Sequence, residues 1–549
     1  MRILGINALY HDPSAALVVD GTTVAAAEEE RFSRRKHGKV PVPFSTWELP
    51  EESIRFCLRS ANIDPADLAA VAYSYDPCLA VSHCGATESL IESEWEALRT
   101  LYAERADRFV ASLLPGRSDT AVHHVAHHVA HAASAWGAAP FDSCAVMVLD
   151  GRGERSSYLA GVSDGQHFEP LAAQPLPDSL GLCYEELTAH LGYRRSSDEY
   201  KVMAMASYGE PAHIDEFREL IRTDGNGGFV TEPIDWFRYA PAGTGDEDVR
   251  PEHANLASTV QKRLEEVLLE LAGWLGEASG ERRLALAGGV ALNCVANSVL
   301  YERGPFDDVW VQPAAGDAGT ALGAAIHVAA AHGDRPQAMT TAALGPEWDD
   351  QQLESALQDA AIPYERPDDV AEAVAEVLAA DGIVAWFQGR SEFGPRALGH
   401  RSLLAHPGHA ANLDRLNAVK GRERYRPVAP MVLAGSATSL FEGGPFPSPY
   451  MLFTHRVRPE WIDRIPAVVH VDGTARIQTV DPSDEPLVHR MIEGFERRTG
   501  LPVVVNTSLN TAGRPMVDHP RDALECFGSA PIDVLAIGPF VVRRGRLYS

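Results

Sequence analysis

The sequence His-His-Val-Ala-His-His-Val-Ala-His occupies residues 123–131 and continues as Ala-Ala-Ser-Ala-Trp to residue 136. Its histidines recur every four residues, and on a helix this spacing places side chains on one face. Two neutral imidazoles held in this way are good ligands for a transition metal. A solvated histidine-rich helix has the same pattern, so the run predicts a helix and leaves its chemistry open.

A carboxylate follows this run at the end of an apolar segment. Residues 144–149 have the composition of a buried strand, and Asp150-Gly-Arg-Gly-Glu154 comes directly after them. A carboxylate at a strand end, beside a histidine pair, is a candidate third ligand. The residues alone do not choose among three histidine pairs with the required spacing: 123 with 127, 124 with 128, and 127 with 131.

A strand–turn–strand pattern occurs twice in the first half of the chain. The first copy spans residues 2–27 with a polar turn at His11-Asp12-Pro-Ser14, and the second spans residues 144–162. Two hairpins facing each other clamp nucleotide phosphates in actin-like and sugar-kinase-like ATPases, which is an analogy of fold alone. Ser14 and the turn backbone are therefore candidate phosphate contacts. The charged segment that follows, residues 28–37, is expected to be exposed.

Two more strand ends carry glycines that let a ligand approach the backbone closely. A predicted strand at 283–287 ends in Gly288-Gly-Val-Ala-Leu-Asn293, and a strand at 309–312 is followed by Gly316-Asp317-Ala-Gly319. Glycine removes the side chain that would block a phosphate, and a following helix N-terminus favours an anion. Each motif is common, so neither is specific by itself.

The sequence changes character near residue 345, where prolines, a glycine and an acidic run occur together. We therefore expect two domains, residues 1–345 and 346–549. The second contains arginine-rich loops at 388–402, 420–426 and 506–514 that follow apolar segments. Guanidinium groups with one lysine neutralise phosphates well, so these loops predict a polyanion site, with solvated or ion-paired arginines as the alternative.

The bulk composition limits the classes of function. A formal net charge of −28 over 549 residues argues against a general nucleic-acid binder. We expect no membrane span and no signal peptide, and hence a cytoplasmic protein. Seven cysteines without a Cys-x-x-Cys pair argue against a zinc knuckle or a disulfide framework.

Taken together, the motifs resemble the NodU/CmcH family of O-carbamoyltransferases, which act in antibiotic and other natural-product biosynthesis. The resemblance covers nearly the whole chain and rests on the following segments: 127–136, 150–154, 288–293, 316–320, 394–402 and 506–510. It implies an α/β protein. The N-terminal domain would be actin-like, similar to a tRNA threonylcarbamoyltransferase, with two duplicated halves. The C-terminal domain would resemble a threonylcarbamoyl-adenylate synthase, with a twisted mixed sheet.

The resemblance also implies a reaction. Carbamoyl phosphate and ATP would give carbamoyl-adenylate in the second domain, and the first domain would transfer the carbamoyl group to an alcohol and release AMP. The divalent metal is expected to be Fe²⁺, with Zn²⁺ or Mn²⁺ as alternatives, and Mg²⁺ would accompany ATP. The expected partner is a small-molecule hydroxyl acceptor, and acidic groups in residues 75–90 and 210–252 favour a cationic one. A homodimer is compatible with the sequence.

Residue roles carry over by position. The metal ligands would be His127, His131, Asp150 and Asp317, with His11, Asp12 and Lys36 as catalytic or substrate contacts. The nucleotide would contact Ser14, Gly151, Gly153, Gly288, Gly289, Asn293, Gly316 and Gly319. Carbamoyl phosphate and ATP would contact Gln388, Arg396, Arg401, Lys420, Arg426, Asn506, Ser508, Asn510 and Arg514. An actin-like ATP-binding regulatory module or a small-molecule kinase remains the alternative, although it leaves the arginine-rich loops without a role.

Overall fold

The computed structural model describes residues 1–38, 48–80, 93–116, 121–245 and 249–545. The chain divides into two compact units, Met1–Met339 and Thr340–Ser549. The division comes slightly before residue 345, because Gly345 donates its backbone N–H to the carbonyl of Ser391 within the second unit. Of the helices within the described ranges, none is both long and apolar enough to cross a bilayer.

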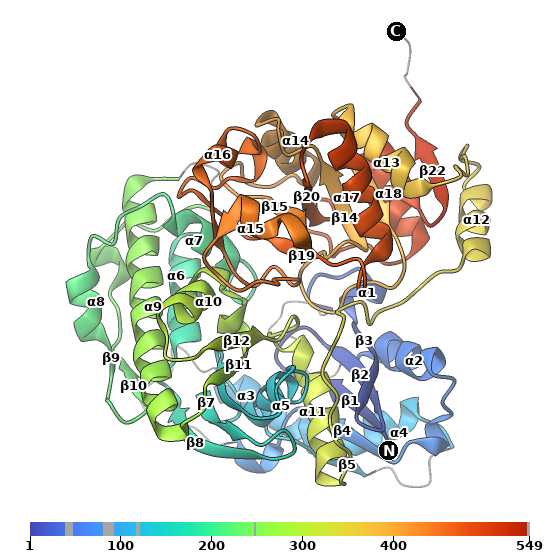
Figure 1. The fold of residues 1–549 in the computed structure, drawn as a ribbon. Coiled ribbons are helices and arrows are strands. Elements are labelled where there is room, and N and C mark those ends of the chain that lie inside the picture. The colour runs from blue at the N-terminus through green and yellow to red at the C-terminus, as the bar shows by residue number, and fades with distance from the viewer. Residues whose placement is uncertain (39–47, 81–92, 117–120, 246–248, 546–549) are drawn as a thin grey trace. The chain divides into compact units, whose positions relative to one another are not determined.

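The first unit contains two five-stranded sheets with the same topology (Figure 1). In the first sheet, with order β3-β2-β1-β4-β5, the β1–β2–β3 meander is antiparallel, and β4 and β5 add in parallel on the other side of β1. The strands are β1 (Arg2–Asn7), β2 (Ser14–Val19), β3 (Thr22–Glu28), β4 (Ala70–Tyr73) and β5 (Val122–His124).

The second sheet repeats this arrangement, with β6, β7 and β8 as the meander and β11 and β12 added in parallel beside β6. Its strands are β6 (Cys144–Leu149), β7 (Ser156–Ser163), β8 (Phe168–Pro175), β11 (Arg283–Ala287) and β12 (Asp308–Val311). The repeat confirms the expected pair of duplicated, actin-like halves. It also makes the β1–β2 turn of one half equivalent to the β6–β7 turn of the other.

Two helices, α5 (His127–Trp136) and α11 (Ala318–Ala331), pack against each other and against the sheets. Helix α11 contacts β1 and β2, whereas α5 contacts β6 and β11, so the pair joins the two halves (Figure 1). Their approach is close because small residues line it: a side chain on Gly323 would lie 1.7 Å from the carbonyl oxygen of Ala130. The small-residue composition of both helices is thereby explained.

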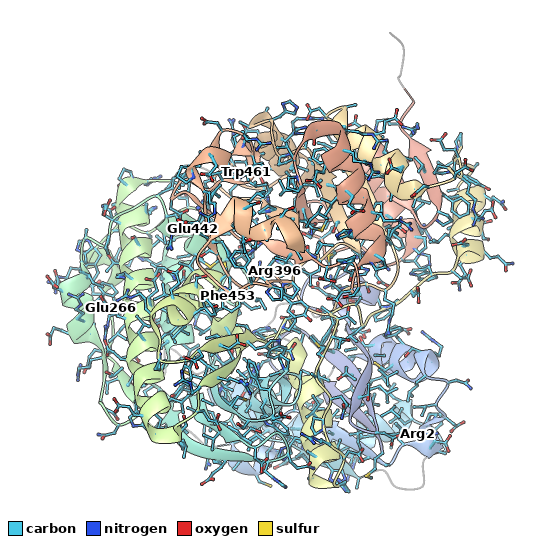
Figure 2. The ribbon with its side chains drawn as sticks, viewed as in Figure 1. Arg2, Glu266, Arg396, Glu442, Phe453 and Trp461 are labelled. Atoms are coloured by element: carbon cyan, nitrogen blue, oxygen red, sulfur yellow. The ribbon has the colours of Figure 1, made fainter. Side chains whose placement is uncertain are left out.

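The remaining helices of this unit cover the two halves. They are α1 (Glu30–Ser33), α2 (Glu51–Ser60), α3 (Ser93–Ala103), α4 (Ala106–Leu113), α6 (Leu180–His190), α7 (Glu199–Ala206), α8 (Ile214–Leu220), α9 (Pro251–Ser279) and α10 (Cys294–Arg303). A small antiparallel hairpin, β9 (Ile221–Thr223) with β10 (Phe229–Thr231), follows α8. Arg218 of α8 donates to Glu266 of α9 at 2.7 Å and ties these two helices together. Figure 2 labels Glu266.

The second unit is built on a seven-stranded mixed sheet of order β19-β15-β20-β14-β13-β21-β22. Its strands are β13 (Val384–Phe387), β14 (Arg401–Ala405), β15 (Ala429–Leu433), β19 (Gln478–Val480), β20 (Val503–Ser508), β21 (Val534–Ile537) and β22 (Phe540–Arg543). β15–β19 and β13–β21 are the parallel pairs among these strands. Trp386, Leu403 and Val504 are fully buried in its core. The mixed sheet confirms the class expected for this part of the chain.

Helices and a small sheet surround this core. The helices are α12 (Asp350–Asp359), α13 (Val370–Ala379), α14 (Ala411–Lys420), α15 (Ala437–Leu440), α16 (Pro459–Ile462), α17 (Pro486–Thr499) and α18 (Pro520–Ser529). The small antiparallel sheet contains β16 (Phe441–Glu442), β17 (His455–Val457) and β18 (Thr474–Ala475). Helices α13 and α17 pack against each other.

Two local predictions were wrong. The histidine run is not one helix: His123 and His124 belong to β5, and the helix begins at His127. Strand pairing decides this, because β5 aligns with β4 and Tyr73 lies opposite His124. Residues 28–37 are not uniformly exposed either, since Arg31 is buried and its guanidinium contacts the buried carboxylate of Glu28.

Candidate functional site

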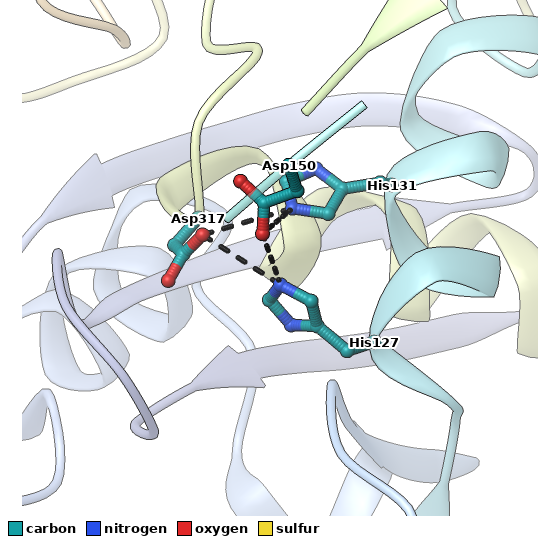
Figure 3. A group of neighbouring side chains, drawn as sticks. All are labelled: His127, His131, Asp150 and Asp317. Carbon is teal, nitrogen blue, oxygen red and sulfur yellow. Dashed lines mark hydrogen bonds and ion pairs between the residues drawn. The ribbon is translucent and has the colours of Figure 1, made fainter. Parts of the chain in front are cut away.

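Four buried side chains meet at the junction of the two halves of the first unit (Figure 3). His127 and His131 project from successive turns of α5, Asp150 follows β6, and Asp317 precedes α11. One ligand atom from each residue lies within 4.8 Å of all the others. The four-residue spacing of the helix places both imidazoles on the face toward the carboxylates.

The distances between these atoms fit a single metal ion. His127 Nε2 lies 3.2 Å from Asp150 Oδ2 and 3.6 Å from Asp317 Oδ1. His131 Nε2 lies 3.9 and 3.7 Å from the same two oxygens. Donors arranged tetrahedrally at about 2.1 Å from an ion are about 3.4 Å apart, which is close to these values. Two imidazoles and two carboxylates suit a first-row divalent metal.

The charges of these four side chains also favour a bound cation. His131 Nε2 and Asp317 Oδ1 are buried and have no hydrogen-bond partner among the described residues. Burial lowers the pKa of His127, but Asp150 and Asp317 outweigh it and raise that pKa to about 9. A cluster that binds a proton this tightly is one that a metal can occupy in the proton's place, because the same carboxylates attract both. The residues present therefore fit a metal ion.

Glu154 holds the start of α5, a role that the sequence analysis did not assign. Its carboxylate accepts the backbone N–H of His127 at 2.9 Å and that of Asp76 at 2.8 Å. Helix α5 has no side-chain cap from its own N-cap residue, so Glu154 satisfies one of its free donors. The Asp150–Glu154 turn thus contacts the helix at both its backbone and its first imidazole. The signal was present in the sequence as an acidic residue four positions after Asp150.

The β1–β2 turn reaches the same group from the other half. The backbone N–H of His11 lies 3.4 Å from Asp317 Oδ2, and its Nε2 lies 3.7 Å from that oxygen. Burial lowers the pKa of His11, whereas Asp317 and Asp12 raise it to about 10. Tyr10 and Asp12 both have left-handed backbone conformations, with φ of 55° and 49°. Such strain in a non-glycine residue is concentrated at functional sites.

Lys36 and His37 approach this turn from beyond α1. His37 Nδ1 lies 2.9 Å from Asp12 Oδ1, and its Nε2 lies 2.8 Å from the hydroxyl of Ser197. Lys36 donates to the same hydroxyl at 3.0 Å. The structure thus brings the three expected catalytic residues, His11, Asp12 and Lys36, into one chain of contacts. His37 and Ser197 were missed because they belong to no recognisable motif.

Of the residues expected to contact nucleotide, the double glycine lies beside Asp150, whereas Asn293 and Ser14 make hydrogen bonds within the fold. Gly288 has φ of +92°, and Gly289 donates its N–H to Asp150 Oδ1 at 3.0 Å, which links the double glycine to the metal group. Asn293 caps α10 and donates to Gln261 at 2.8 Å. Ser14 is fully buried and donates to the carbonyl of Ala318, so its hydroxyl is used inside the fold.

The remaining glycines of this set lie beside the metal group, and two make close packing contacts. A side chain on Gly153 would lie 2.8 Å from the His128 ring, and one on Gly319 would lie 2.1 Å from the carbonyl oxygen of Ala314. Gly151 adjoins Asp150, and Gly316 adjoins Asp317. Of the segments expected to shape an acceptor pocket, residues 81–90 and 246–248 lie outside the described residues.

In the second unit, Lys420 lies at the centre of a polar group. It is the last residue of α14, is nearly buried, and donates to the carbonyl and hydroxyl of Ser508 at 2.6 and 2.9 Å. It also donates to the side-chain oxygen of Asn510. Burial and the neighbouring Arg422 and Arg426 hold the pKa of Lys420 well below its usual range. A buried lysine whose positive charge is disfavoured by neighbouring cations is suited to contact a polyanion, which would raise its pKa.

The other predicted residues of this unit differ in their surroundings, and the contacts of Arg401 and Asn506 favour structural roles. Arg401 is fully buried and donates to the carbonyls of Gln388, Gly389 and Pro346 at 2.8, 3.1 and 3.2 Å, stacked over Phe387. Asn506 is also fully buried and donates to Ala397 and Gln478. Gln388 donates to Gly538, and Arg514 is exposed and paired with Glu525. Arg426 pairs with Glu423, and Arg396 lies in the loop after β13 (Figure 2).

Glu392 orders the loop that contains Arg396. One of its carboxylate oxygens accepts three backbone N–H groups, those of Leu398, His400 and Arg401, at 2.6, 3.0 and 3.2 Å. His400 contacts Glu485 at 3.0 Å. Burial lowers the pKa of His400, but Glu485 and Glu392 outweigh it and raise that pKa. Neither Glu392 nor Glu485 was singled out from the sequence.

The fold and the buried histidine–aspartate group define an actin-like domain with a candidate metal site, joined to a second α/β unit, and sequence comparison assigns the family. The profile described as Carbamoyltransferase N-terminus matches residues 2–326, and that described as Carbamoyltransferase C-terminus matches residues 375–544. The chain belongs to the carbamoyltransferase family and is a carbamoyltransferase enzyme. The expected resemblance is thereby confirmed.

Relatives extend over most of the chain. Nodulation protein NolNO of Sinorhizobium fredii is 38% identical over 98% of this chain and 80% of its own length. Nodulation protein NolO of Bradyrhizobium diazoefficiens is 40% identical over 76% of this chain and 78% of its own length. Among solved structures, HypF of T. kodakarensis aligns with 60% of this chain and 48% of its own, at 15% identity and a TM-score of 0.37.

Proposed function

We propose that this carbamoyltransferase is ATP-dependent. It makes carbamoyl-adenylate from carbamoyl phosphate and ATP, and it transfers the carbamoyl group to a hydroxyl of a small natural product. The observation that carries the proposal is the meeting of His127, His131, Asp150 and Asp317 beside the His11 turn, in a chain of this family. A metal site next to a histidine supplies what carbamoyl transfer to an alcohol requires, namely an electrophile activator and a base.

The adenylating step is assigned to the second unit. Water cleaves carbamoyl phosphate to carbamate and phosphate. A carbamate oxygen then attacks the α-phosphorus of ATP, and pyrophosphate leaves. Lys420 with Ser508 and Asn510 would contact the anionic groups, and Arg396 and Arg426 would neutralise charge that develops on the phosphates. Mg²⁺ would accompany ATP. The contacts of Arg401 and Asn506 make them supports of this region.

The transfer step is assigned to the first unit. A divalent ion held by His127, His131, Asp150 and Asp317 would act as a Lewis acid toward the carbamoyl-adenylate, with Fe²⁺ expected and Zn²⁺ or Mn²⁺ as alternatives. A divalent ion on Asp150 and Asp317 would offset two of the carboxylates that raise the pKa of His11, so the imidazole would be neutral when the ion is bound. His11 would then take the proton of the acceptor hydroxyl through Nε2. The alcohol oxygen then bonds to the carbamoyl carbon, the bond between that carbon and the AMP oxygen breaks, and AMP leaves.

The acceptor class follows from charge and from the family. A cationic acceptor, as in antibiotic biosynthesis, suits a chain whose net charge is −28.

The test is ATP consumption with carbamoyl phosphate and Mg²⁺, resolving AMP, ADP and pyrophosphate. We expect pyrophosphate that depends on carbamoyl phosphate, and AMP that rises when an acceptor alcohol is added. Aminoglycosides and neutral sugars of similar size would be compared as acceptors. Release of ADP without dependence on carbamoyl phosphate would contradict the proposal, because a kinase-type reaction transfers the γ-phosphoryl group.

A further inference from the structure

We propose that His37 is a positioning residue of the transfer site, acting through Asp12 to fix the orientation and tautomer of His11. The inference rests on the proposed function, in which His11 is the base. Asp12 uses both carboxylate oxygens for this purpose: Oδ2 lies 2.9 Å from His11 Nδ1, and Oδ1 lies 2.9 Å from His37 Nδ1. One carboxylate therefore joins two imidazoles that are far apart in the sequence.

The direction of the hydrogen bonds fixes the tautomers. A lysine ammonium group only donates, so Lys36 donates to Ser197 Oγ at 3.0 Å, and the same hydroxyl lies at hydrogen-bonding distance, 2.8 Å, from His37 Nε2. An ionised carboxylate only accepts, so His37 and His11 both donate to Asp12 from Nδ1.

The consequence concerns the nitrogen of His11 that lies on the reacting side. With its proton on Nδ1, neutral His11 has an unprotonated Nε2, and this is the nitrogen that faces Asp317 Oδ2 at 3.7 Å. A carboxylate that orients a catalytic histidine in this way is a general feature of triads. A carboxylate held by one oxygen could rotate. His37 prevents this rotation of the Asp12 carboxylate, because it contacts the second oxygen, Oδ1.

The backbone supports the same assignment. His37 has φ of 63°, and Ser196, which precedes Ser197, has φ of 53°. Together with Tyr10 and Asp12, these residues place left-handed backbone at each end of the hydrogen-bonded chain. Non-glycine residues adopt this conformation at a cost, so the surrounding structure must impose it. The strain is concentrated where Asp12, His37 and Ser197 are aligned.

The same three side chains, His11, Asp12 and His37, also have the composition of a metal site, with donor atoms within 4.8 Å. Two features favour the hydrogen-bonded arrangement. Both Nδ1 atoms already lie at hydrogen-bonding distance from Asp12, and the ammonium group of Lys36 contacts the serine on which His37 depends. A second cation would have to displace those protons beside an existing positive charge.

The experiment measures methyl carbamate formed from ATP, carbamoyl phosphate and Mg²⁺ with methanol as the probe acceptor, on the full-length, metal-loaded protein. His37→Ala should lower kcat about 10- to 100-fold while leaving KM for carbamoyl phosphate unchanged, as for other outer partners of a reactive group. His37→Asn, whose amide can still donate to Asp12, should recover most of the rate. His167→Ala is the matched control, because His167 pairs with Asp164 on an exposed hairpin at 3.3 Å.

A double-mutant cycle gives the decisive comparison. In an Asp12→Ala background, His37→Ala should have little further effect, since the two residues act as a unit. The inference would be overturned if the rate reductions of the two single variants multiplied in the double variant. A full rate in His37→Ala would also overturn it. So would the finding of two bound metal ions, one of which is lost in His37→Ala. Pyrophosphate release is measured in the same samples. Its absence in the unmodified protein would contradict the proposed function, whereas its presence with an unaffected His37→Ala would contradict this inference alone.

Discussion

At the scale of single residues, the resemblance to a known family named all four members of the buried histidine–aspartate group, and the structure supplied their surroundings. The spacing of the histidines alone left three pairs open. The register of the family motif chose His127 and His131, and the fold brings them together with Asp150 and Asp317. Glu154 was not selected, because a buried carboxylate that caps a helix from another segment has no local signature. His37 was not selected either, because it lies in the charged segment 28–37, which was expected to be exposed.

The two ends of the histidine run provide a matched comparison. His131→Ala should release most of the bound metal and lower carbamoyl transfer by more than about 100-fold, the upper end of the effect of losing an outer partner of a metal ligand. His123→Ala, in β5, should leave both unchanged, because its ring contacts His332 and lies outside the metal group. Metal content by elemental analysis, together with methyl carbamate formation, checks both variants. Equal metal loss in the two would contradict the chosen register.

Lys420 should determine a proton-linked binding step. Its pKa is held low in the free protein, and the phosphates of ATP would raise it, so binding should take up a proton at a pH where the lysine is partly neutral. Calorimetry in two buffers of different ionisation enthalpy measures that uptake.

Lys420→Met should abolish this uptake and lower pyrophosphate formation about 10²- to 10³-fold, as expected for loss of a preorganised electrostatic contact. Lys262→Met, at a half-exposed lysine of the other unit, is the control. Proton uptake that persists without Lys420 would assign the titrating group elsewhere.

At the scale of elements, long and strongly patterned segments were predicted well. The expected strands at 144–149 and 283–287 match β6 and β11. The short strands β4 and β5 were not predicted, because they gain their stability from pairing with β1 and with each other. This pairing also explains why the helix prediction failed at the start of the histidine run. The spacing of His123 and His124 is helical, but the pairing of β5 with β4 places both residues in a strand.

The contact between α5 and α11 should be intolerant of added volume. Gly323→Ala would push the methyl group into the carbonyl of Ala130, and the two helices that carry the metal ligands would have to separate. We expect a loss of about 1–3 kcal/mol in the free energy of unfolding, with weaker metal binding.

Gly273→Ala is the matched control. It also lies within a helix, α9, but no atom lies within 4 Å of the added methyl group. This variant should be neutral or more stable by about 0.5–1 kcal/mol, because alanine is the better helix former. Denaturant unfolding and metal titration check both variants, and equal effects would show that packing between α5 and α11 is unimportant.

At the scale of the whole molecule, the sequence predicted the repeated halves and the second α/β unit, and the order of the strands confirms the repeat. The repeat makes the His11 turn and the Asp150 turn structurally equivalent, although they share little sequence. What the sequence could not give is the set of long-range contacts between such turns, because these depend on how the sheets close around α5 and α11.

The two proposed half-reactions should separate when the metal is removed. Stripping the protein with a chelator for transition metals, followed by readdition of Mg²⁺, should leave pyrophosphate formation largely intact and abolish methyl carbamate formation. Readdition of Fe²⁺, Zn²⁺ or Mn²⁺ in turn should restore transfer, and the most effective ion identifies the cofactor. Loss of both activities together would show that the metal serves the adenylating step as well.

The positions of the four candidate metal ligands along the chain have a consequence for biosynthesis. His127, His131 and Asp150 emerge from the ribosome early, whereas Asp317 emerges only when the first unit is almost complete. A nascent chain therefore holds two imidazoles and one carboxylate for a long stretch of translation, a set that any divalent ion in the cell can occupy weakly. On the proposed function, the complete ligand set would form only when α11 docks, so metal loading would be a late event that coincides with closure of the domain.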